Sequence, residues 1–358
     1  YITVHLGAPN DTSARNVTVS FRDYIKNVAS SEIYPTWPEA ALRANILAQI
    51  TFAQNRIFTE WYPSRGYNFN ITNNTAYDQY FVYGRNIFTN ISRLVDELFD
   101  QYIRRRGAVN PIFAQYCNGT TVTCGGLSQW GTVALANNGY TPLGILRYYY
   151  GDDIVIDTAT VQRRITSSYP GAPLTVGSRG EDVRTIRTWL NRIRRNYPAI
   201  PAISTTGGDT YNAEMQRSVQ AFQRIFNLTP DGIVGPATWN KIAYIYVAVM
   251  RLAELGGEDI PLPAERPSST LRRGSSGETV RLAQYFLRVI ALYDDEIPPI
   301  TIDGSYGPAT ENAVRAFQKC RALPWMASLA PPPGMPCTSA SSASPKPPVW
   351  PLPTPAPR

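Results

Sequence analysis

The sequence predicts a multidomain α+β protein, in which an N-terminal mixed α/β domain is followed by two small three-helix modules. Three observations support this prediction. The chain of 358 residues is longer than one typical domain. One pattern occurs twice in the second half of the chain, as is typical of repeated modules. The first half instead mixes alternating, strand-like stretches with longer stretches of helical periodicity.

The N-terminal domain is predicted to begin with two strands, because Ile2–Leu6 and Val17–Phe21 alternate apolar and polar residues. A long helix is expected to start after Pro38, since proline is favoured at a helix start and apolar residues then recur at helical spacing. Two further helices are expected over Val133–Asn137 and from Thr141 to Tyr150, the first ending at a glycine.

The repeated pattern starts with a Gly-x-x-Gly turn. The first copy opens with Leu174-Thr-Val-Gly-Ser-Arg-Gly, and the second opens with Leu271-Arg-Arg-Gly-Ser-Ser-Gly. Glycine permits the backbone conformations that such a turn needs before a helix. Both copies later contain Val-x-Ala-Phe-Gln, at Val219–Gln223 and Val314–Gln318. Only the first copy then continues into Asp-Gly-Ile-Val-Gly-Pro-Ala-Thr-Trp-Asn, at 231–240, so the second copy is predicted to be incomplete.

Apolar residues at helical spacing predict the core of the first module. Phe222 and Trp239 are interpreted as core residues, with contact to a ligand as the alternative. Tyr211 and Tyr306 occupy matching positions in the two copies and are weaker candidates for a ligand groove. The face expected to be apolar on the first helix consists of Val183, Ile186, Leu190 and Ile193.

The two copies resemble the three-helix peptidoglycan-binding module found beside bacterial cell-wall hydrolases. The resemblance covers roughly Leu174–Glu254 and Leu271–Cys320. It implies peptidoglycan glycan strands as the partner, with other cell-wall hydrolases as further partners. It also implies an extracytoplasmic location, in the bacterial cell wall or the spore envelope.

Composition limits the partners and the chemistry. The net charge of +7 suits an anionic polymer, but no nucleic-acid motif accompanies the basic clusters, so we do not expect a nucleic acid as partner. No apolar run is long enough to predict a transmembrane segment. His5 is the only histidine, which argues against Ser/His/Asp triads, His-rich zinc sites and a peptide-cleaving amidase of the zinc type. Catalysis by carboxylates is the remaining expectation.

No cofactor and no metal are expected. Cys117 and Cys124 lie in a loop rich in Gly and Thr, where a disulfide, two free thiols or part of a metal site can be considered. Two thiolates alone make a poor zinc site, so a disulfide or two free thiols is the favoured interpretation.

Three stretches of the N-terminal domain carry a second resemblance. They are Tyr24 to Glu32, then Trp37-Pro-Glu-Ala-Ala-Leu-Arg-Ala-Asn45, then Leu127-Ser-Gln-Trp-Gly131 with a Tyr-Tyr-Tyr ending at Tyr150. In this order they are similar to the catalytic domain of the stage II sporulation protein D family. The loop before Leu127 lacks the histidine that some members use for zinc, and the domain is short for the family. A non-catalytic protein that binds or enhances processing of the wall therefore stays open.

This second resemblance implies lytic transglycosylase activity on glycan strands, with one carboxyl group as acid and then base. In the family this role falls on the Glu before the Trp-Pro helix, which is Glu32 in this chain. Such an acid needs an apolar site that keeps it protonated near neutral pH. The alternative for Glu32 is a solvated or capping carboxylate. Glu39 is the second candidate, although the helix dipole explains a carboxylate in a first turn.

Ser128, Gln129 and Trp130 are candidates for the glycan groove. An amide can hydrogen-bond sugar hydroxyls, and an indole ring can stack on a sugar face. The alternative for Trp130 is packing in the core.

The expected domains follow from these patterns. The second module ends in a stretch rich in Ala, Pro and Ser, which predicts a disordered tail. The expected ranges are 1–152 for the N-terminal domain, 153–173 for a linker, 174–256 for the first module, 257–270 for a second linker, 271–320 for the incomplete module and 321–358 for the tail.

A second interpretation of the tail follows from the genetic code. Read from the third base of each codon, Pro324–Cys337 can spell Val-Asp-Gly-Ile-Val-Gly-Pro-Ala-Thr-Trp-Asn-Ala-Leu with synonymous codons. This nearly repeats Pro230–Ile242 of the first module. We therefore hypothesise that a frameshift near Lys319 replaced the end of the second module. The loss of a third helix is expected to leave Val314 and Phe317 poorly covered.

Overall fold

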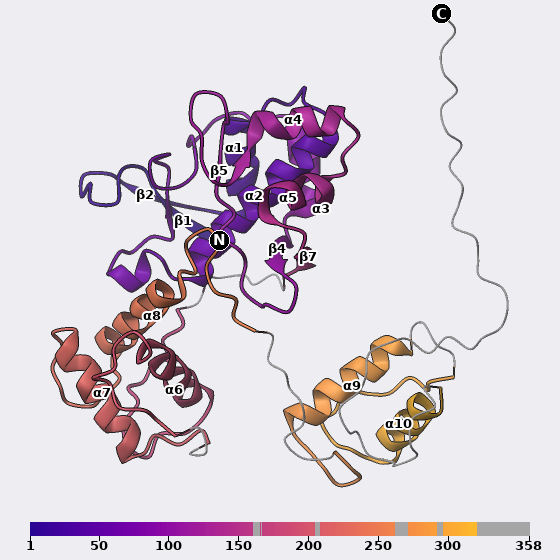
Figure 1. The fold of residues 1–358 in the computed structure, drawn as a ribbon. Coiled ribbons are helices and arrows are strands. Elements are labelled where there is room, and N and C mark those ends of the chain that lie inside the picture. Colours follow the sequence, from indigo (N-terminus) through magenta and orange to yellow (C-terminus); the bar gives the residue numbers. More distant parts are fainter. Residues whose placement is uncertain (160–164, 166, 205–207, 262–270, 292–295, 321–358) are drawn as a thin grey trace, which may run out of the picture. The chain divides into compact units, whose positions relative to one another are not determined.

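The computed structural model describes residues 1–159, 165, 167–204, 208–261, 271–291 and 296–320 (Figure 1). The chain divides into two compact units, Tyr1–Leu262 and Pro263–Arg358. The first unit combines a mixed α/β domain with a bundle of three helices, and the described part of the second contains two helices. The predicted multidomain α+β class is confirmed. The predicted tail, with the hypothesis of a frameshift in it, lies outside the described residues.

The strands of the N-terminal domain are short. In the first sheet β1 lies between β2 and β3, antiparallel to β2 and parallel to β3. β4 and β7 pair antiparallel, whereas β5 and β6 pair parallel. The strands are β1 (Ile2–His5), β2 (Asn16–Val19), β3 (Ile71–Thr72), β4 (Gln101–Arg105), β5 (Tyr116–Cys117), β6 (Leu127–Ser128) and β7 (Ile154–Thr158). β7 therefore lies within the residues expected to be a linker, and the other domain boundaries stay predictions.

Capping side chains explain where two elements differ from the sequence-based expectation. β2 ends at Val19, earlier than predicted. The Ser20 hydroxyl accepts a hydrogen bond from the Asp23 amide and so caps the start of the next helix. The helix predicted from Val133 instead begins at Gln129, because the hydroxyl of Ser128 accepts the Gly131 amide at 3.0 Å.

Helix α2 forms the centre of the N-terminal domain (Figure 1). It packs against α1, α3, α4, α5 and β4, and it is buried over most of its surface. Its buried polar side chains, such as Asn45 and Gln49, must therefore find partners inside the protein. The helices are α1 (Phe21–Glu32), α2 (Glu39–Phe58), α3 (Thr89–Leu98), α4 (Gln129–Asn137) and α5 (Pro142–Tyr150), with a short 3₁₀ helix, η1 (Pro63–Arg65).

The first module is a bundle of α6 (Glu181–Ile193), α7 (Ala213–Ile225) and α8 (Pro236–Met250). The four residues predicted for the apolar face of α6 are buried, as are Phe222 and Trp239, which confirms their interpretation as core. Two backbone hydrogen bonds hold the Gly-x-x-Gly turn. The Gly177 amide donates to the Tyr211 carbonyl at 2.9 Å, and the Tyr211 amide donates to the Ser178 carbonyl at 2.8 Å. Gly177 adopts φ +96°, which side chains rarely permit.

The three-helix bundle packs directly on the N-terminal domain within the first unit. Asn55 of α2 donates to the Leu252 carbonyl at 2.8 Å. Trp61 packs against the core of the bundle, and the guanidinium of Arg65 lies 4.4 Å from the centre of the Tyr244 ring. The Trp239 indole donates to the hydroxyl of Ser168 at 2.8 Å. The two parts thus share an interface of hydrogen bonds and aromatic contacts.

The second unit repeats the start of the first module. Its described helices are α9 (Glu278–Ile290) and α10 (Pro308–Cys320). Its turn makes the equivalent backbone hydrogen bonds. The Gly274 amide donates to the Tyr306 carbonyl at 3.1 Å, and the Tyr306 amide donates to the Ser275 carbonyl at 2.8 Å. In the described part of the chain, no helix is long and apolar enough to cross a membrane.

The expected exposure of Val314 is wrong. Val314 is fully buried between α9 and α10, and Phe317 is half-buried against the same cluster, which includes Leu271. Among the described residues of this unit, the large exposed apolar side chains lie on α9, where Tyr285 is 52% exposed and Phe286 is 54% exposed. Within the described residues, α9 and α10 cover the face that they share, and the exposed rings lie elsewhere on α9.

Candidate functional site

Glu32 is the last residue of α1. The helix ends there because Ile33 turns to an extended backbone conformation, and the next residues lead into the Trp37-Pro38 start of α2. Glu32 is half-buried, and it does not line the cavities of about 650 and 720 Å³ that Tyr1 borders. The site around Glu32 is therefore defined by its contacts with neighbouring side chains.

The Glu32 carboxylate accepts hydrogen bonds from three different segments. The Tyr80 amide donates to Oε1 at 2.8 Å, and the Gln49 side chain donates to Oε2 at 2.8 Å. The Gln129 side chain lies at 3.5 Å from Oε2. These donors come from a loop, from α2 and from α4, so the fold gathers them around one carboxyl group.

The surroundings of Glu32 favour its protonated form near neutral pH. Removal from water raises the pKa of Glu32 to about 7, and hydrogen bonds from Tyr116, Tyr80, Gln49 and Gln129 act against this rise. A carboxyl group that titrates near pH 7 can both give and take a proton under the same conditions. The geometry therefore suits an acid–base role better than a solvated or capping carboxylate.

Three aromatic rings pack against each other beside the Glu32 segment: Tyr34 and Trp37 follow Glu32 closely in the sequence, whereas Trp130 comes from α4. The rings of Trp37 and Trp130 are 4.8 Å apart, and Tyr34 lies 5.7 Å from each of them. Trp37 is buried, whereas Trp130 is 43% exposed and Tyr34 is 58% exposed. Trp130 is thus not a core residue, and its exposed ring offers a flat apolar surface beside the Glu32 segment.

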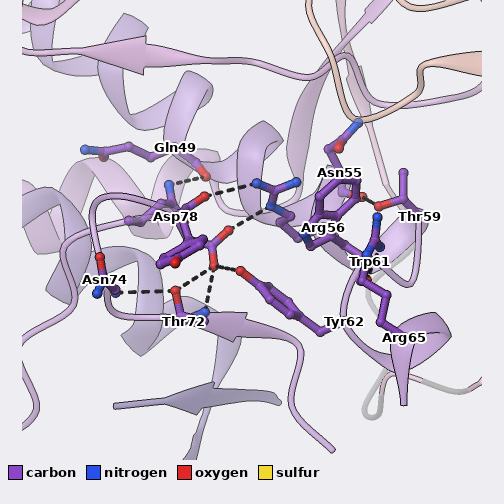
Figure 2. A network of polar contacts seen from close by, with 12 residues as sticks. Gln49, Asn55, Arg56, Thr59, Trp61, Tyr62, Arg65, Thr72, Asn74 and Asp78 are labelled. Carbon is purple, nitrogen blue, oxygen red and sulfur yellow. Dashed lines mark hydrogen bonds and ion pairs between the residues drawn. The ribbon is translucent and has the colours of Figure 1, made fainter. Parts of the chain in front are cut away.

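The loop that donates to Glu32 through the Tyr80 amide contains one partner of a buried ion pair, which Figure 2 shows. Arg56 of α2 donates through Nε to Asp78 at 2.8 Å, and both side chains are buried. The Asp78 carboxylate also accepts from the Thr72 amide at 2.9 Å and from the Tyr62 hydroxyl. Buried charges persist only when they are paired and hydrogen-bonded in this way. The pair fixes the loop immediately before Gln79 and Tyr80.

Gln79 extends this loop into the site. It is fully buried. Its side chain donates to the backbone carbonyl of Gln49 at 3.0 Å and to the Tyr116 hydroxyl at 2.9 Å. Its own oxygen accepts from the Tyr24 hydroxyl at 3.0 Å. Tyr116 in turn contacts Glu32, so Gln79 orients a second donor toward the carboxyl group.

Ser128, which precedes Gln129, has a structural role. Its hydroxyl caps α4 and lies against Gly119, where a Cβ atom would come within 1.8 Å of it. The adjacent loop is closed by a disulfide between Cys117 and Cys124, which confirms one of the two favoured interpretations. The Asn118 carbonyl of this loop accepts the Trp130 amide at 3.1 Å, so the loop helps to place Trp130.

Tyr211 and Tyr306 lie in the cores of their modules. Tyr211 is fully buried and donates to the Gly232 carbonyl at 2.7 Å, while Tyr306 is 2% exposed. Neither ring presents a surface that a glycan could contact in these positions. The structure thus brings Glu32, Gln129 and Trp130 together and leaves the two tyrosines apart from them.

A glutamine clasp, which the sequence reasoning missed, joins consecutive helices in both modules. In the first module, Gln223 of α7 donates to Asp231 at 2.8 Å and to Thr238 at 3.1 Å, and it accepts the Gly232 amide at 2.8 Å. Sequence comparison could have found it, because Asp-Gly-x-x-Gly-Pro-Ala-Thr occurs at both 231–238 and 303–310.

The second clasp lies one helix earlier in its module. Gln284 of α9 donates to Asp303 at 2.8 Å and to Thr310 at 2.9 Å, and it accepts the Gly304 amide at 2.8 Å. The Asp-Gly segment therefore precedes the second helix in this module and the third helix in the first module. When the two copies are aligned on their Phe-Gln segments, the two Asp-Gly segments therefore fall at different positions and the shared clasp is not apparent.

Replacing Gln223 by alanine is expected to destabilise the first module by roughly 2 to 3 kcal/mol, because the buried Gly232 amide and Thr238 hydroxyl lose their partner. Thermal unfolding followed by circular dichroism measures this effect. Arg217→Ala, on the exposed side of the same helix, is the matched control and should unfold within about 0.5 kcal/mol of the unchanged protein. Equal losses in both variants would contradict the importance of the clasp.

Residues 179–242 and 276–324 match the family model of the peptidoglycan binding domain. The chain carries a peptidoglycan-binding domain in two segments. The first segment spans α6, α7 and the first half of α8, whereas the second spans α9 and α10 and ends shortly after them. These two peptidoglycan-binding segments thus agree with the predicted modules.

A curated relative is the N-acetylmuramoyl-L-alanine amidase CwlL of Bacillus licheniformis, which is 31% identical to this chain over 162 residues. The match covers 44% of this chain and 43% of the relative's length. The chain therefore spans less than half of the relative that it matches.

Proposed function

We propose that this protein processes bacterial peptidoglycan as a lytic transglycosylase, with Glu32 as its acid–base residue. The observation that carries the proposal is the half-buried Glu32 carboxyl group, whose pKa of about 7 lies within the range of a working acid. The exposed ring of Trp130 beside it suits a sugar face. The two peptidoglycan-binding segments support a role on the cell wall, where they would hold the enzyme on its polymer.

The proposed reaction uses Glu32 twice. The protonated carboxyl group donates its proton to the glycosidic oxygen, and the bond from that oxygen to the anomeric carbon breaks. The resulting carboxylate then takes the proton of the sugar's own 6-hydroxyl group, whose oxygen bonds to the anomeric carbon. The products are a strand with an anhydro ring and a strand with a free hydroxyl, and Glu32 is protonated again. No water is consumed.

The resemblance to the stage II sporulation protein D family supports this assignment of Glu32. The residue stands before the Trp-Pro start of a helix, and the Ser-Gln-Trp segment lies beside it in the fold as well as in the motif. A place in the spore envelope is part of this proposal, since it depends on the same resemblance.

The second candidate is a protein that binds or helps to process the wall without cutting glycan. It is favoured by the extent of the family match, which covers the binding segments and begins only at residue 179. An amidase activity, named for the relative, is a third outcome that an experiment must separate.

Mass spectrometry of purified glycan strands incubated with the protein tests the proposal. We expect fragments that end in anhydro sugars. Fragments with ordinary reducing ends would indicate hydrolysis, and released stem peptides would indicate an amidase. Binding to the strands with no new product would support the second candidate and overturn the proposed activity.

Trp130→Ala is expected to raise the KM for glycan strands about tenfold, because the loss of one exposed aromatic contact costs roughly 1 to 2 kcal/mol. The turnover number should change much less, since Glu32 keeps its own donors. Tyr140→Ala removes an exposed ring beyond the other end of α4 and is the matched control. A KM unchanged by Trp130→Ala would exclude the ring from the groove.

A further inference from the structure

The side chain of Gln49 shows an unexplained feature. It is fully buried on α2, and its Nε2 donates to Glu32 Oε2 at 2.8 Å. Its Oε1 is also buried and makes no hydrogen bond. A buried acceptor without a donor is unfavourable, so this geometry calls for a second state in which the oxygen is used.

The acid–base cycle supplies that second state. An ionised Glu32 accepts hydrogen bonds only, which suits the Nε2 atom of Gln49. A protonated Glu32 carries a hydrogen that needs an acceptor. Oε1 is occupied by the Tyr80 amide at 2.8 Å, so the proton belongs on Oε2, the oxygen that faces Gln49. Half a turn of the Gln49 amide would bring its unused oxygen to that proton.

We propose that Gln49 is a positioning residue that turns its side-chain amide as Glu32 gains and loses its proton. The proposal rests on the acid–base role of Glu32 given above. In the ionised state Nε2 donates to Glu32, and in the protonated state the amide oxygen accepts from it. The turn places the NH₂ group where the unpaired oxygen was, so it breaks no hydrogen bond at the far end of the amide. Gln49 thus holds the carboxyl group in one position through both steps.

The other titratable groups around Glu32 stay in one state while it titrates. Tyr116 and Tyr24 face the carboxyl group from β5 and α1, and burial raises the pKa of both well above the usual value. The charge of Asp78 is paired with Arg56. Near pH 7 the proton on Glu32 is therefore the change that Gln49 would sense.

Nuclear magnetic resonance of the complete protein, labelled with ¹⁵N in glutamine side chains, tests this directly. We expect the Gln49 amide signals to shift with a midpoint near pH 7, and the contact between its NH₂ hydrogens and Glu32 to be lost at low pH. Gln49→Met identifies these signals by removing them. The same shift must be absent in Glu32→Gln. An amide contact that is unchanged at pH 5 would overturn the proposal, whatever the protein's activity.

The rate of glycan cleavage gives a second readout. Gln49→Met, which keeps the length of the side chain but not its amide, should lower turnover about 10- to 100-fold at every pH and change KM less than about twofold. Gln54→Met, a half-buried position on the same helix that is not a partner of Glu32, is the control and should retain full activity. Wild-type turnover in Gln49→Met would contradict the proposal, while no product from the unchanged protein would instead contradict the transglycosylase.

A different observation supports an inference about the second module. Phe286 stands eight residues after the start of α9, as Trp189 does after the start of α6. Trp189 is half-buried, because its ring contacts Trp239 at 5.6 Å and Tyr246 at 5.3 Å, both on α8. Phe286 is 54% exposed. The exposed face of α9 is thus the face that a third helix covers in the first module.

We infer that this face of α9 is the packing surface for a third helix, which the gene encodes in another reading frame. The shifted reading of Pro324–Cys337 supplies the segment that such a helix requires. It contains Asp-Gly for a glutamine clasp, Gly-Pro-Ala-Thr for a helix start, and a Trp at the position equivalent to Trp239. Gln318 stands where Gln223 stands, at the end of Val-x-Ala-Phe-Gln, and would form that clasp.

Two experiments test this inference. The codons from Leu323 to Cys337 must spell the shifted segment when the gene is sequenced, and any other codons there would overturn it. A full-length variant with the shifted reading after Lys319 should raise the melting temperature of the second module by at least about 10 °C. Phe286→Ala should remove most of that gain and change the original chain little. An equal melting temperature in the two chains would show that no third helix is seated.

Discussion

Glu32→Gln is expected to reduce the formation of anhydro-ended glycan fragments by about 10³-fold or more. The glutamine keeps the size of the side chain but can neither donate a proton to the glycosidic oxygen nor accept one from the 6-hydroxyl group. Both steps of the proposed reaction are lost together. The measurement is the initial rate of product formation from purified strands, resolved by chromatography and mass spectrometry.

Glu39→Gln is the matched control. Glu39 also precedes the body of α2, but it is exposed and paired with Arg43 at 2.8 Å and with Arg93 at 3.2 Å. Its pKa is lowered, first by the hydrogen bond from Arg43, so it is ionised when an acid must be protonated. We expect nearly full activity in this variant. Persistence of product in Glu32→Gln, or its loss in Glu39→Gln, would move the acid away from Glu32.

The second expected result is that Glu32→Gln makes the protein more stable at pH 8, by on the order of 2 to 3 kcal/mol, and equally stable at pH 4. The ordinary pKa of the carboxyl group is 4.5, and the folded protein raises it to about 7. The ionised form is therefore the one that the fold tolerates poorly. An amide in the same place has no charge to remove from water.

The sign follows from proton binding. Between pH 4.5 and 7 the folded protein retains a proton on Glu32 that the unfolded chain has released. The free energy of unfolding must then fall as the pH rises through this window, and it stays level above it. Denaturant unfolding of the two proteins at pH 4, 6 and 8 measures the difference. A difference that does not grow with pH would mean that the carboxyl group is well solvated in the fold.

The sequence alone makes Glu32 a candidate acid, because its neighbours in the chain carry the motif. The partners that set its pKa could not, because they lie far along the chain. Gln49, Tyr80 and Gln129 are separated from Glu32 by 17, 48 and 97 residues. The burial of α2 and the loop held by Asp78 bring Gln49 and Tyr80 to Glu32, and α4 brings Gln129. Periodicity shows which face of a helix is buried, but not which loop will reach it.

The fate of the paired tyrosines has a similar cause. Tyr211 and Tyr306 stand at equivalent positions, which suggested a shared ligand contact. The structure shows that equivalence can equally reflect a shared structural task, since each backbone closes a Gly-x-x-Gly turn and each ring fills a core. Ser128 was chosen for its motif in the same way and proves to cap a helix. Pattern matching alone does not separate the two kinds of role.

The glutamine clasp changes what counts as the repeating element of these modules. Gln223 ties α7 to α8, and Gln284 ties α9 to α10, through the same Asp-Gly and Thr partners. The element that recurs is therefore one helix with the turn that follows it, which is smaller than the module. A module built from such helix–turn elements can lose its last element while the earlier elements stay joined. If the second copy is shortened, as we propose, the Gln284 link would keep its two described helices joined.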